Sequence, residues 1–238
     1  MKNLRAVLFL ICAVFVCNLK ANIQEKLPFQ AGLIIFRENI QKFCGGSLIS
    51  PFFVLSAAHC TFGAKKIQVI LGANNYKENE KSQVVVTTKL WNNHEQFNNT
   101  DFTNDISLIK LPYKILLNQQ INTIKIGRNT KNTNIFYSGW PEGTKNNNGY
   151  LKVIKVKILT NNICGGIYKN IKDSNICTIS NDNNSTGCYG FSGGPLIENN
   201  KQIGIVSYGS KNCDKSIPIV HVNLLKYFKW IKRNMEFN

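Results

Sequence analysis

Short segments rich in β-branched and aromatic residues follow one another through most of the chain, separated by turn-forming clusters. The strand-like segments cover residues 43–49, 53–57, 66–72, 82–90, 105–111, 150–159 and 201–209. Clusters rich in Gly, Asn and Ser lie between them, at residues 72–75, 142–149 and 180–187. Because short strands at close spacing pair with their neighbours, the pattern predicts an all-β, mostly antiparallel sandwich or barrel.

The C-terminal end departs from this pattern. Leu224, Leu225, Phe228 and Ile231 recur at helical spacing with lysines between them. We expect a closing helix that packs on the barrel. A helix that lies on a membrane surface is the alternative.

The first 21 residues have the features of a signal peptide. Lys2 and Arg5 precede an apolar run at residues 6–17, which is too short to span a membrane. Ala21 offers a small residue for cleavage, so residues 1–21 are predicted to be removed from a secreted, extracellular protein with no transmembrane segment. An uncleaved anchor is the alternative.

Cysteine usage fits an oxidising compartment. Removal of residues 1–21 removes two of the eight cysteines. The six that remain are Cys44, Cys60, Cys164, Cys177, Cys188 and Cys213. An even number predicts a disulfide framework. Metal binding is disfavoured because no C-x-x-C pair occurs and the three histidines are scattered, and no residue pattern suggests a cofactor.

The chain is strongly basic. Its formal net charge is +16, and loss of Lys2, Arg5 and Lys20 lowers it to +13. Such a charge favours anionic partners, such as an anionic polysaccharide, a phospholipid surface or an acidic protein. The lysines are nevertheless spread without a dense block, so a solvated surface is the preferred interpretation. We expect a monomer that binds no specific nucleic acid.

Three segments carry residues typical of nucleophilic catalysis. They are SAAHC around His59, NDISLIKL around Asp105, and GFSGGP around Ser192. A serine hydroxyl is a poor nucleophile until a neighbouring base takes its proton, and a histidine serves this purpose. Each segment alone is a weak signal, but the order His, Asp, Ser in a β-rich secreted chain is specific.

With these segments, the chain resembles the chymotrypsin-like serine proteases. The likeness extends from PFQAGLI and FCGGSLISPFFVLSAAHC through YSGWPEGT and IVSYG to the final WIKR. The resemblance implies a Ser-His-Asp triad. His59 would act as base and then as acid, Asp105 would hold the imidazole in the useful tautomer, and Ser192 would be the nucleophile.

The resemblance also implies the architecture of the site. Two antiparallel six-stranded β-barrels would pack face to face, the first from about residues 22–115 and the second, with the C-terminal α-helix, from residues 116–238. His59 and Asp105 would lie in the first barrel and Ser192 in the second. The backbone N–H groups of Gly190 and Ser192 would form the oxyanion hole.

Family pairing of the cysteines accounts for all six. It predicts the disulfides Cys44–Cys60, Cys164–Cys177 and Cys188–Cys213. Another bridge common in the family would link the positions of Ile135 and Glu198, and here both cysteines are absent together.

Phe191 departs from the family pattern. Relatives activated by cleavage have an aspartate here, which pairs with the amino group of a new Ile-Val N-terminus. This sequence has neither the aspartate nor an Ile-Val-Gly-Gly motif. Either the oxyanion loop is disordered, at a cost of about 10²–10³ in rate, or Phe191 packs beneath the loop and keeps it competent without activation. We favour some hydrolytic activity.

The specificity pocket is expected to be shallow. By position, Thr186 would lie at its base, Gly209 and Ile217 on its walls, and Ser207 at its mouth. A base without aspartate disfavours cleavage after Lys or Arg, and Ile217 would fill much of the slot. The pocket would then accept small apolar side chains or be closed.

The remaining histidines and the glycosylation sequons lie outside this constellation. His94 and His221 are interpreted as structural or solvated, because the sequence suggests no carboxylate partner for either. Asn98, Asn183 and Asn184 begin N-x-S/T sequons. Glycosylation at Asn98 is plausible on a loop, whereas Asn184 lies close to the pocket base.

Three functions remain open from the sequence. The first is a secreted serine endopeptidase acting without zymogen activation. The second is a catalytically impaired protease homologue that serves as a decoy or cofactor for a cascade protein. The third is a basic anion-binding protein that uses the fold as a scaffold.

Overall fold

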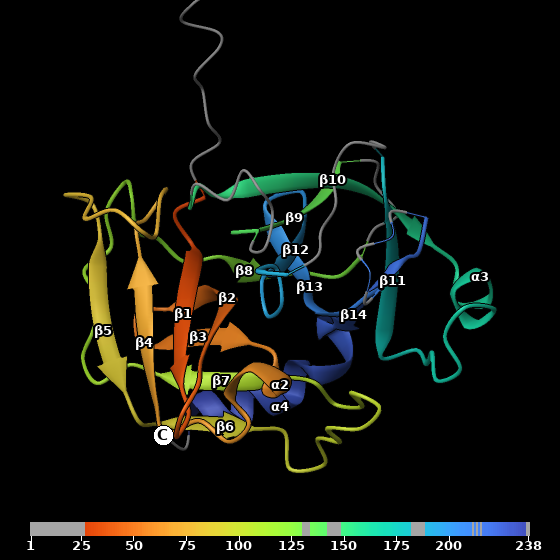
Figure 1. Cartoon of the computed structure of the whole chain (residues 1–238), viewed down its shortest axis with the longest axis horizontal. Coiled ribbons are helices and arrows are strands. Elements are labelled where there is room, and N and C mark those ends of the chain that lie inside the picture. The colour runs from red at the N-terminus through yellow and green to blue at the C-terminus, as the bar shows by residue number, and fades with distance from the viewer. Residues whose placement is uncertain are drawn as a thin grey trace, which may run out of the picture.

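The fold consists of two β-sheets that lie side by side, with one helix across them (Figure 1). The computed structural model describes residues 27–129, 134–141, 149–181, 189–210, 212, 214 and 216–236. The proposed signal peptide therefore lies outside the described residues. Among those residues, no helix has the length and apolar character needed to cross a membrane.

The first sheet takes its strands from the N-terminal half in the order β5-β4-β1-β2-β3-β7-β6. Their bounds are β1 Gln30–Phe36, β2 Gln41–Ser50, β3 Phe53–Ser56, β4 Lys66–Leu71, β5 Val84–Thr88, β6 Trp91–Asn93 and β7 Ser107–Lys110. All neighbouring strands pair antiparallel. Within the described chain this sheet stays open, with β5 and β6 at its edges.

The second sheet closes into a barrel in the order β12-β9-β10-β11-β14-β13, because β12 also pairs with β13. Its bounds are β9 Ile135–Gly139, β10 Lys152–Leu159, β11 Asn175–Ser180, β12 Pro195–Glu198, β13 Lys201–Tyr208 and β14 Ile219–Asn223. The short strand β8, Lys125–Ile126, adds to β13 in parallel. The predicted all-β class with two barrel-like sheets is confirmed, and each sheet has seven described strands rather than six.

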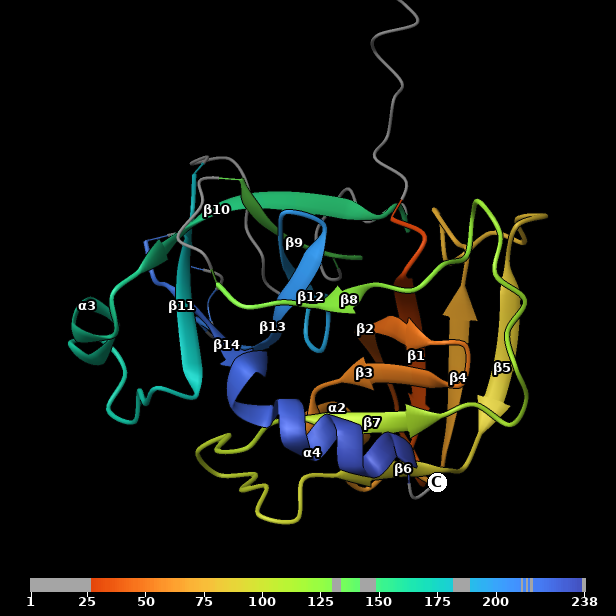
Figure 2. The same ribbon diagram turned by 180° about the vertical axis from the view of Figure 1, so that it is seen from behind.

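Helix α4, Leu224–Glu236, covers the first barrel although it follows the last strand of the second (Figure 2). It buries Leu224, Tyr227, Trp230 and Ile231, all of which join the core of the first sheet. The sequence-based choice of Leu225 and Phe228 for the buried face is wrong, since they are 56% and 41% exposed. Tyr227 and Trp230 face inward instead, because the tyrosine hydroxyl and the indole N–H each find a hydrogen-bond acceptor.

Those partners tie the helix to the loop before Asp105. The Tyr227 hydroxyl donates to Asn104 Oδ1 at 2.8 Å, and Trp230 Nε1 donates to Glu95 Oε2 at 2.9 Å. His94 stacks on the Trp230 ring with 5.4 Å between centroids. Its Nδ1 lies 3.9 Å from Glu95 Oε2, so the expectation that His94 lacks a carboxylate neighbour is wrong. Glu95 follows His94 in the chain, and its carboxylate comes near the His94 ring because it also accepts from the indole N–H of Trp230.

Buried hydrogen bonds join the two sheets. Ser47 Oγ donates to Gln202 Oε1 at 2.6 Å, and Ser138 Oγ donates to Gln30 Oε1 at 2.6 Å. Buried polar pairs of this kind are costly to separate, because each would leave an unsatisfied group. They fix how the barrels meet, and therefore how residues from the two halves approach each other.

Two of the three predicted disulfides lie within the described residues. Cys44 is bonded to Cys60, and Cys164 to Cys177. Cys164 lies in the short helix α3, Asn161–Gly165. The proposed Cys188–Cys213 bridge lies outside the described residues. Ile135 and Glu198 are register partners on β9 and β12, so the positions of the missing family bridge do lie opposite each other.

Candidate active site

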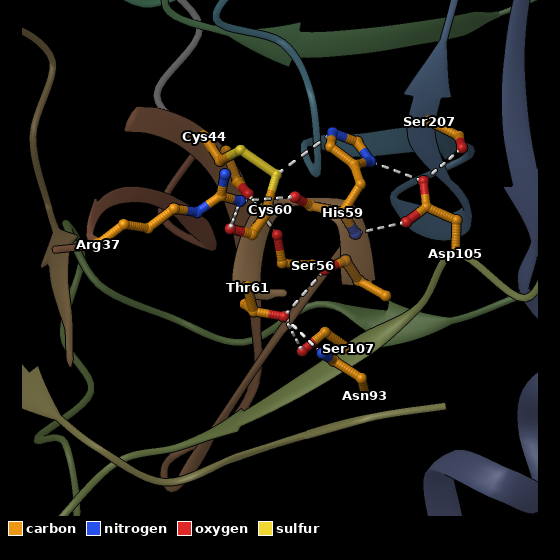
Figure 3. Close-up of a disulfide and its surroundings, with 12 residues drawn as sticks. Arg37, Cys44, Ser56, His59, Cys60, Thr61, Asn93, Asp105, Ser107 and Ser207 are labelled. Carbon is orange, nitrogen blue, oxygen red and sulfur yellow. Dashed lines mark hydrogen bonds and ion pairs between the residues drawn. A yellow bond between two sulfur atoms is a disulfide. The ribbon is translucent and has the colours of Figure 1, made fainter. Parts of the chain in front are cut away.

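His59 lies on the single-turn helix α2, Ala58–Thr61, directly after β3. Its side chain is buried, with 7% exposure. Thr61 Oγ1 donates to Ser107 Oγ on β7 at 2.9 Å, and also contacts Asn93 Oδ1 on β6. The Cys44–Cys60 disulfide attaches the same turn to β2. These links hold the imidazole between β2 and the segment that carries Asp105 (Figure 3).

Asp105 is fully buried and accepts three hydrogen bonds. The backbone N–H of His59 donates to Oδ1 at 2.8 Å, while His59 Nδ1 and the Ser207 hydroxyl donate to Oδ2. Burial would raise the pKa of Asp105, but the charge that His59 carries when its ring is protonated, and the hydrogen bonds from His59 and Ser207, outweigh burial and hold the pKa below its ordinary value. Asp105 is therefore an ionised acceptor aimed at the imidazole.

This arrangement fixes the tautomer of His59. Because Nδ1 lies 2.7 Å from an ionised carboxylate, it carries the ring hydrogen, and Nε2 of the neutral imidazole keeps its lone pair. Among the described residues, no donor points at Nε2. Its neighbour Cys60 Sγ, at 3.6 Å, belongs to a disulfide and has no hydrogen to give. That disulfide also removes the two thiolates that a metal at this cluster would need.

Ser192 lies on the loop that leads into β12, and this loop is bonded to both sheets. The N–H of Gly45, on β2, donates to Ser192 O at 2.7 Å. The N–H of Gly193 donates to Val206 O on β13 at 2.8 Å. Gly193 has φ 78°, and a Cβ there would lie 2.3 Å from Ser56 Oγ, so only glycine fits. Ser192 is thus held beside the strand whose Cys44 is bonded to the neighbour of His59.

The N–H groups of Gly190 and Ser192 donate to no other described residue. Gly190 has φ 89°, a left-handed conformation that glycine adopts at little cost. Its carbonyl accepts from the N–H of Trp140 at 3.2 Å. The loop is therefore anchored through its carbonyls, and these two amides have no acceptor within the described part of the chain.

Phe191 is fully buried beneath this loop. Its ring meets Tyr137 edge to face, with 5.2 Å between centroids, in an apolar cluster of the second barrel. Gly139 lies directly against it, since a Cβ on Gly139 would be 2.8 Å from the ring. Phe191 O accepts from the N–H of Gly194 at 2.8 Å, which closes the turn around Ser192.

Three of the four residues proposed for the pocket lie within the described chain. The Ser207 hydroxyl donates to Asp105 Oδ2, so it is engaged by the carboxylate beside His59. Ile217 lies on the turn before β14, where its N–H donates to Asp214 O. The isoleucine next to Gly209 is Ile219, because a Cβ on Gly209 would lie 3.3 Å from Ile219 Cγ1. Thr186 lies outside the described residues.

Phe102 adds an apolar wall that the sequence did not indicate. Its ring edge meets His59 with 5.4 Å between centroids, and it tilts against Tyr208 at 5.7 Å. Phe102 and Asn104 both have left-handed backbone, with φ 57° and 55°. Such conformations are strained for a bulky residue and persist where the surroundings enforce them. Here they turn the chain so that Asp105 enters the interior.

The other candidate residues have partners outside the His59–Asp105 pair or lie outside the described residues. His221 is fully buried, lies 2.7 Å from Thr178 Oγ1, and burial lowers its pKa to about 3, so it is neutral. Asn98 is exposed, and its Oδ1 accepts from the N–H of Thr100 at 2.8 Å. Asn183 and Asn184 lie outside the described residues.

Comparison with known proteins gives a family match over most of the chain. The profile of the Trypsin family matches residues 16–231. The chain is similar to chymotrypsin of Phaedon cochleariae, with 33% identity over 90% of this chain and 80% of the relative. It is similar to brachyurin of Leptuca pugilator, with 35% identity over 86% and 92%. It is similar to trypsin of Sus scrofa, with 32% identity over 90% and 93%.

Proposed function

Because the chain belongs to the trypsin family of serine proteases, we propose that it is a secreted endopeptidase that cleaves peptide bonds with His59, Asp105 and Ser192. The observation that carries the proposal is the buried His59–Asp105 pair, whose geometry leaves Nε2 of the imidazole as a free acceptor. A general base in this state can take a proton from a serine hydroxyl.

The proposed reaction has two halves. Ser192 Oγ attacks the carbonyl carbon of the substrate while Nε2 of His59 takes the hydroxyl proton, and the carbonyl oxygen becomes an oxyanion. The free N–H groups of Gly190 and Ser192 donate to that oxyanion. The proton then passes from Nε2 to the leaving amine as the C–N bond breaks. Water attacks the acyl-enzyme by the same route and releases the second product.

Phe191 supports activity without zymogen processing. An ion pair beneath the loop would have to be completed by a new N-terminus, whereas a ring packed on Tyr137 and Gly139 needs no partner. The carbonyls of Gly190 and Phe191 are already bonded, so the loop does not depend on a cleavage event for its anchoring. We therefore propose an enzyme that is competent when secreted.

A fluorophosphonate probe tests the proposed catalysis. Such probes phosphonylate a serine whose hydroxyl is activated by a neighbouring base, with fluoride as the leaving group, so we expect labelling of Ser192 in the secreted protein. Labelling should be absent in Ser192→Ala and in heat-denatured protein, as read by mass spectrometry of the modified peptide. Labelling of the wild type no greater than that of Ser192→Ala would favour the alternative, an impaired homologue that binds a partner without cleaving it.

The pocket for the acyl residue is proposed to be shallow because of Ile219. Its side chain contacts Gly209 from β14, where it occupies space that a larger substrate side chain would need. Substrates with alanine or valine before the cleaved bond should therefore be preferred over those with phenylalanine or lysine.

Shortening Ile219 is expected to widen this preference. In Ile219→Ala, the ratio of kcat/KM for a phenylalanine substrate to that for an alanine substrate should rise by about tenfold or more, since several carbons of space are freed. Ile217→Ala is the matched control, because its backbone lies on the neighbouring turn, and its ratio should stay near that of the wild type. If this ratio changed in Ile217→Ala and not in Ile219→Ala, Ile217 would be the residue that lines the pocket.

A further inference from the structure

Two cationic side chains lie at one end of the β1–β2 hairpin, on the face that points into the first barrel. Lys42 is the register partner of Ile35, and Cys44 is the partner of Leu33. Residues two apart on a strand share a face, so Lys42 lies on the face of the fully buried Cys44. Arg37 lies on the face of Ile35. Arg37 therefore lies beside α2, whose carbonyls it contacts, and Lys42 lies on the same face of the hairpin.

Arg37 contacts the main chain of the catalytic turn. Its Nη2 donates to His59 O at 3.2 Å and to Cys60 O at 3.4 Å. Its Nε is buried and has no acceptor among the described residues. Figure 3 places Arg37 and the Cys44–Cys60 disulfide on one side of His59, and Asp105 with Ser207 on the other.

Lys42 carries a charge that no carboxylate contacts in the described part of the chain. It is half-buried and makes no ion pair there. Burial lowers its pKa, and the charge of Arg37 lowers it further, while Asp105 raises it. Asp105 is already engaged by His59 and Ser207, and Glu38 turns outward to Lys65 at 3.3 Å. Among the described residues, these two neighbouring cations thus lack an anion beside the active site.

Arg37 and Lys42 lie on the side of His59 where the leaving half of a substrate would pass. Under the proposed function, the acyl residue lies toward Gly209 and Ile219, on the side of Asp105 and Ser207. The leaving half must then continue on the opposite side of His59, past the disulfide. Lys42 is three residues before Gly45, whose N–H is bonded to Ser192 O, and this corresponds to about 10 Å along a strand. That distance is about three residues of extended peptide.

We propose that Arg37 and Lys42 form a subsite that selects a carboxylate within the first three residues of the leaving half of the substrate. The carboxylate is supplied by an Asp or Glu side chain, or by the free C-terminus of a short peptide. This inference rests on the proposed protease function. It adds a preference for acidic residues after the cleaved bond.

The test compares quenched-fluorescent peptides that differ only in this carboxylate. Ala-Ala-Val-Ser-Asp-Asp-Ala amide is paired with its Asn-Asn counterpart, and Ala-Ala-Val-Ser-Ala acid is paired with its amide, with the cleaved bond identified by mass spectrometry. We expect kcat/KM to favour the acidic member by about fivefold or more, and the preference to shrink as salt rises. The two pairs separate a side-chain source from a terminal one.

Variants assign the preference to the pair of cations. In Lys42→Met the preference should fall to near one, and Lys42→Arg should keep it. Lys65→Met is the matched control, since Lys65 is an exposed lysine whose N–H bonds to β1 at Phe36 O, and it should leave the preference unchanged. Equal cleavage of acidic and neutral peptides by the wild type, or an unchanged preference in Lys42→Met, would overturn the proposal.

Binding provides a readout that does not depend on turnover. The same unlabelled peptides are titrated into Ser192→Ala and into Ser192→Ala/Lys42→Met by calorimetry. If Ser192→Ala binds the acidic peptides more tightly and Lys42→Met removes this difference, the subsite is supported. If the wild type in addition cleaves nothing, only the protease function is contradicted. Cleavage with no acidic preference in either readout overturns the subsite alone.

Discussion

Replacement of Asp105 by asparagine is expected to lower kcat by about 10⁴-fold, the loss that follows when a Ser-His-Asp triad holds the wrong imidazole tautomer. Asp105 now accepts from both the backbone N–H and Nδ1 of His59, and from Ser207. An amide in its place offers one oxygen and one NH₂ group. If the NH₂ group donates to Nδ1, then Nε2 carries the hydrogen and cannot take the proton of Ser192.

The measurement is kcat for a valine-containing peptide together with the rate of fluorophosphonate labelling. Ser207→Ala serves as the control, because it removes one donor to Asp105 while the carboxylate and the tautomer remain. Its loss should be far smaller than that of Asp105→Asn. Near-equal rates for Asp105→Asn and the wild type would show that the carboxylate does not set the state of His59.

The strand pattern predicted much of the fold because it depends on local chemistry. All of the segments chosen for their β-branched and aromatic residues contain a strand, as β7 and β10 illustrate. Seven of the fourteen described strands lie outside those segments. The shortest of them, β8 and β6, have two and three residues, and so short a segment is extended only where a neighbour pairs with it. The family resemblance supplied the rest of the topology.

Helix α4 shows why a periodic apolar pattern can select the wrong face. Counting only aliphatic residues and Phe favours Leu225 and Phe228, yet the helix buries Tyr227 and Trp230. Their polar atoms bond to Asn104 and Glu95, which are more than 100 residues away in the chain. A tyrosine or tryptophan can be buried where its O–H or N–H is satisfied, and sequence spacing does not reveal such partners.

The candidate site was predictable in its motif residues and not in the groups that support them. The order of His59, Asp105 and Ser192 was visible in the sequence, and the structure brings His59 and Asp105 into contact. The Ser207 hydroxyl comes from the other barrel and meets Asp105 only through tertiary packing. The isoleucine next to Gly209 is Ile219. The sequence did not indicate this because the loop before Ile219 has no anchoring motif, whereas the pairing of β14 with β11 and β13 fixes its position.

Replacement of Phe191 by aspartate is expected to destabilise the protein by about 3–5 kcal/mol, because the introduced carboxylate would be buried without a cation. The cluster around Phe191 is apolar and includes Tyr137, Leu196 and Val206. Phe191→Leu keeps most of the apolar volume and should cost only about 1 kcal/mol. The free energy of unfolding in urea measures both.

The pH dependence distinguishes a buried charge from simple loss of the ring. Burial raises the pKa of a carboxyl group in the folded state above its unfolded value of about 4, so the folded state binds the proton more tightly. The cost of Phe191→Asp is then fully present above the folded pKa, and it shrinks as the pH falls toward the unfolded value. Phe228→Asp is the matched control on the surface of α4, where Phe228 is 41% exposed. It should change the free energy of unfolding little at neutral pH and at a pH near 4. If Phe191→Asp were as stable as Phe191→Leu at neutral pH, a cation would have to reach the space beneath the Ser192 loop, and the packed ring would not be what holds that loop in place.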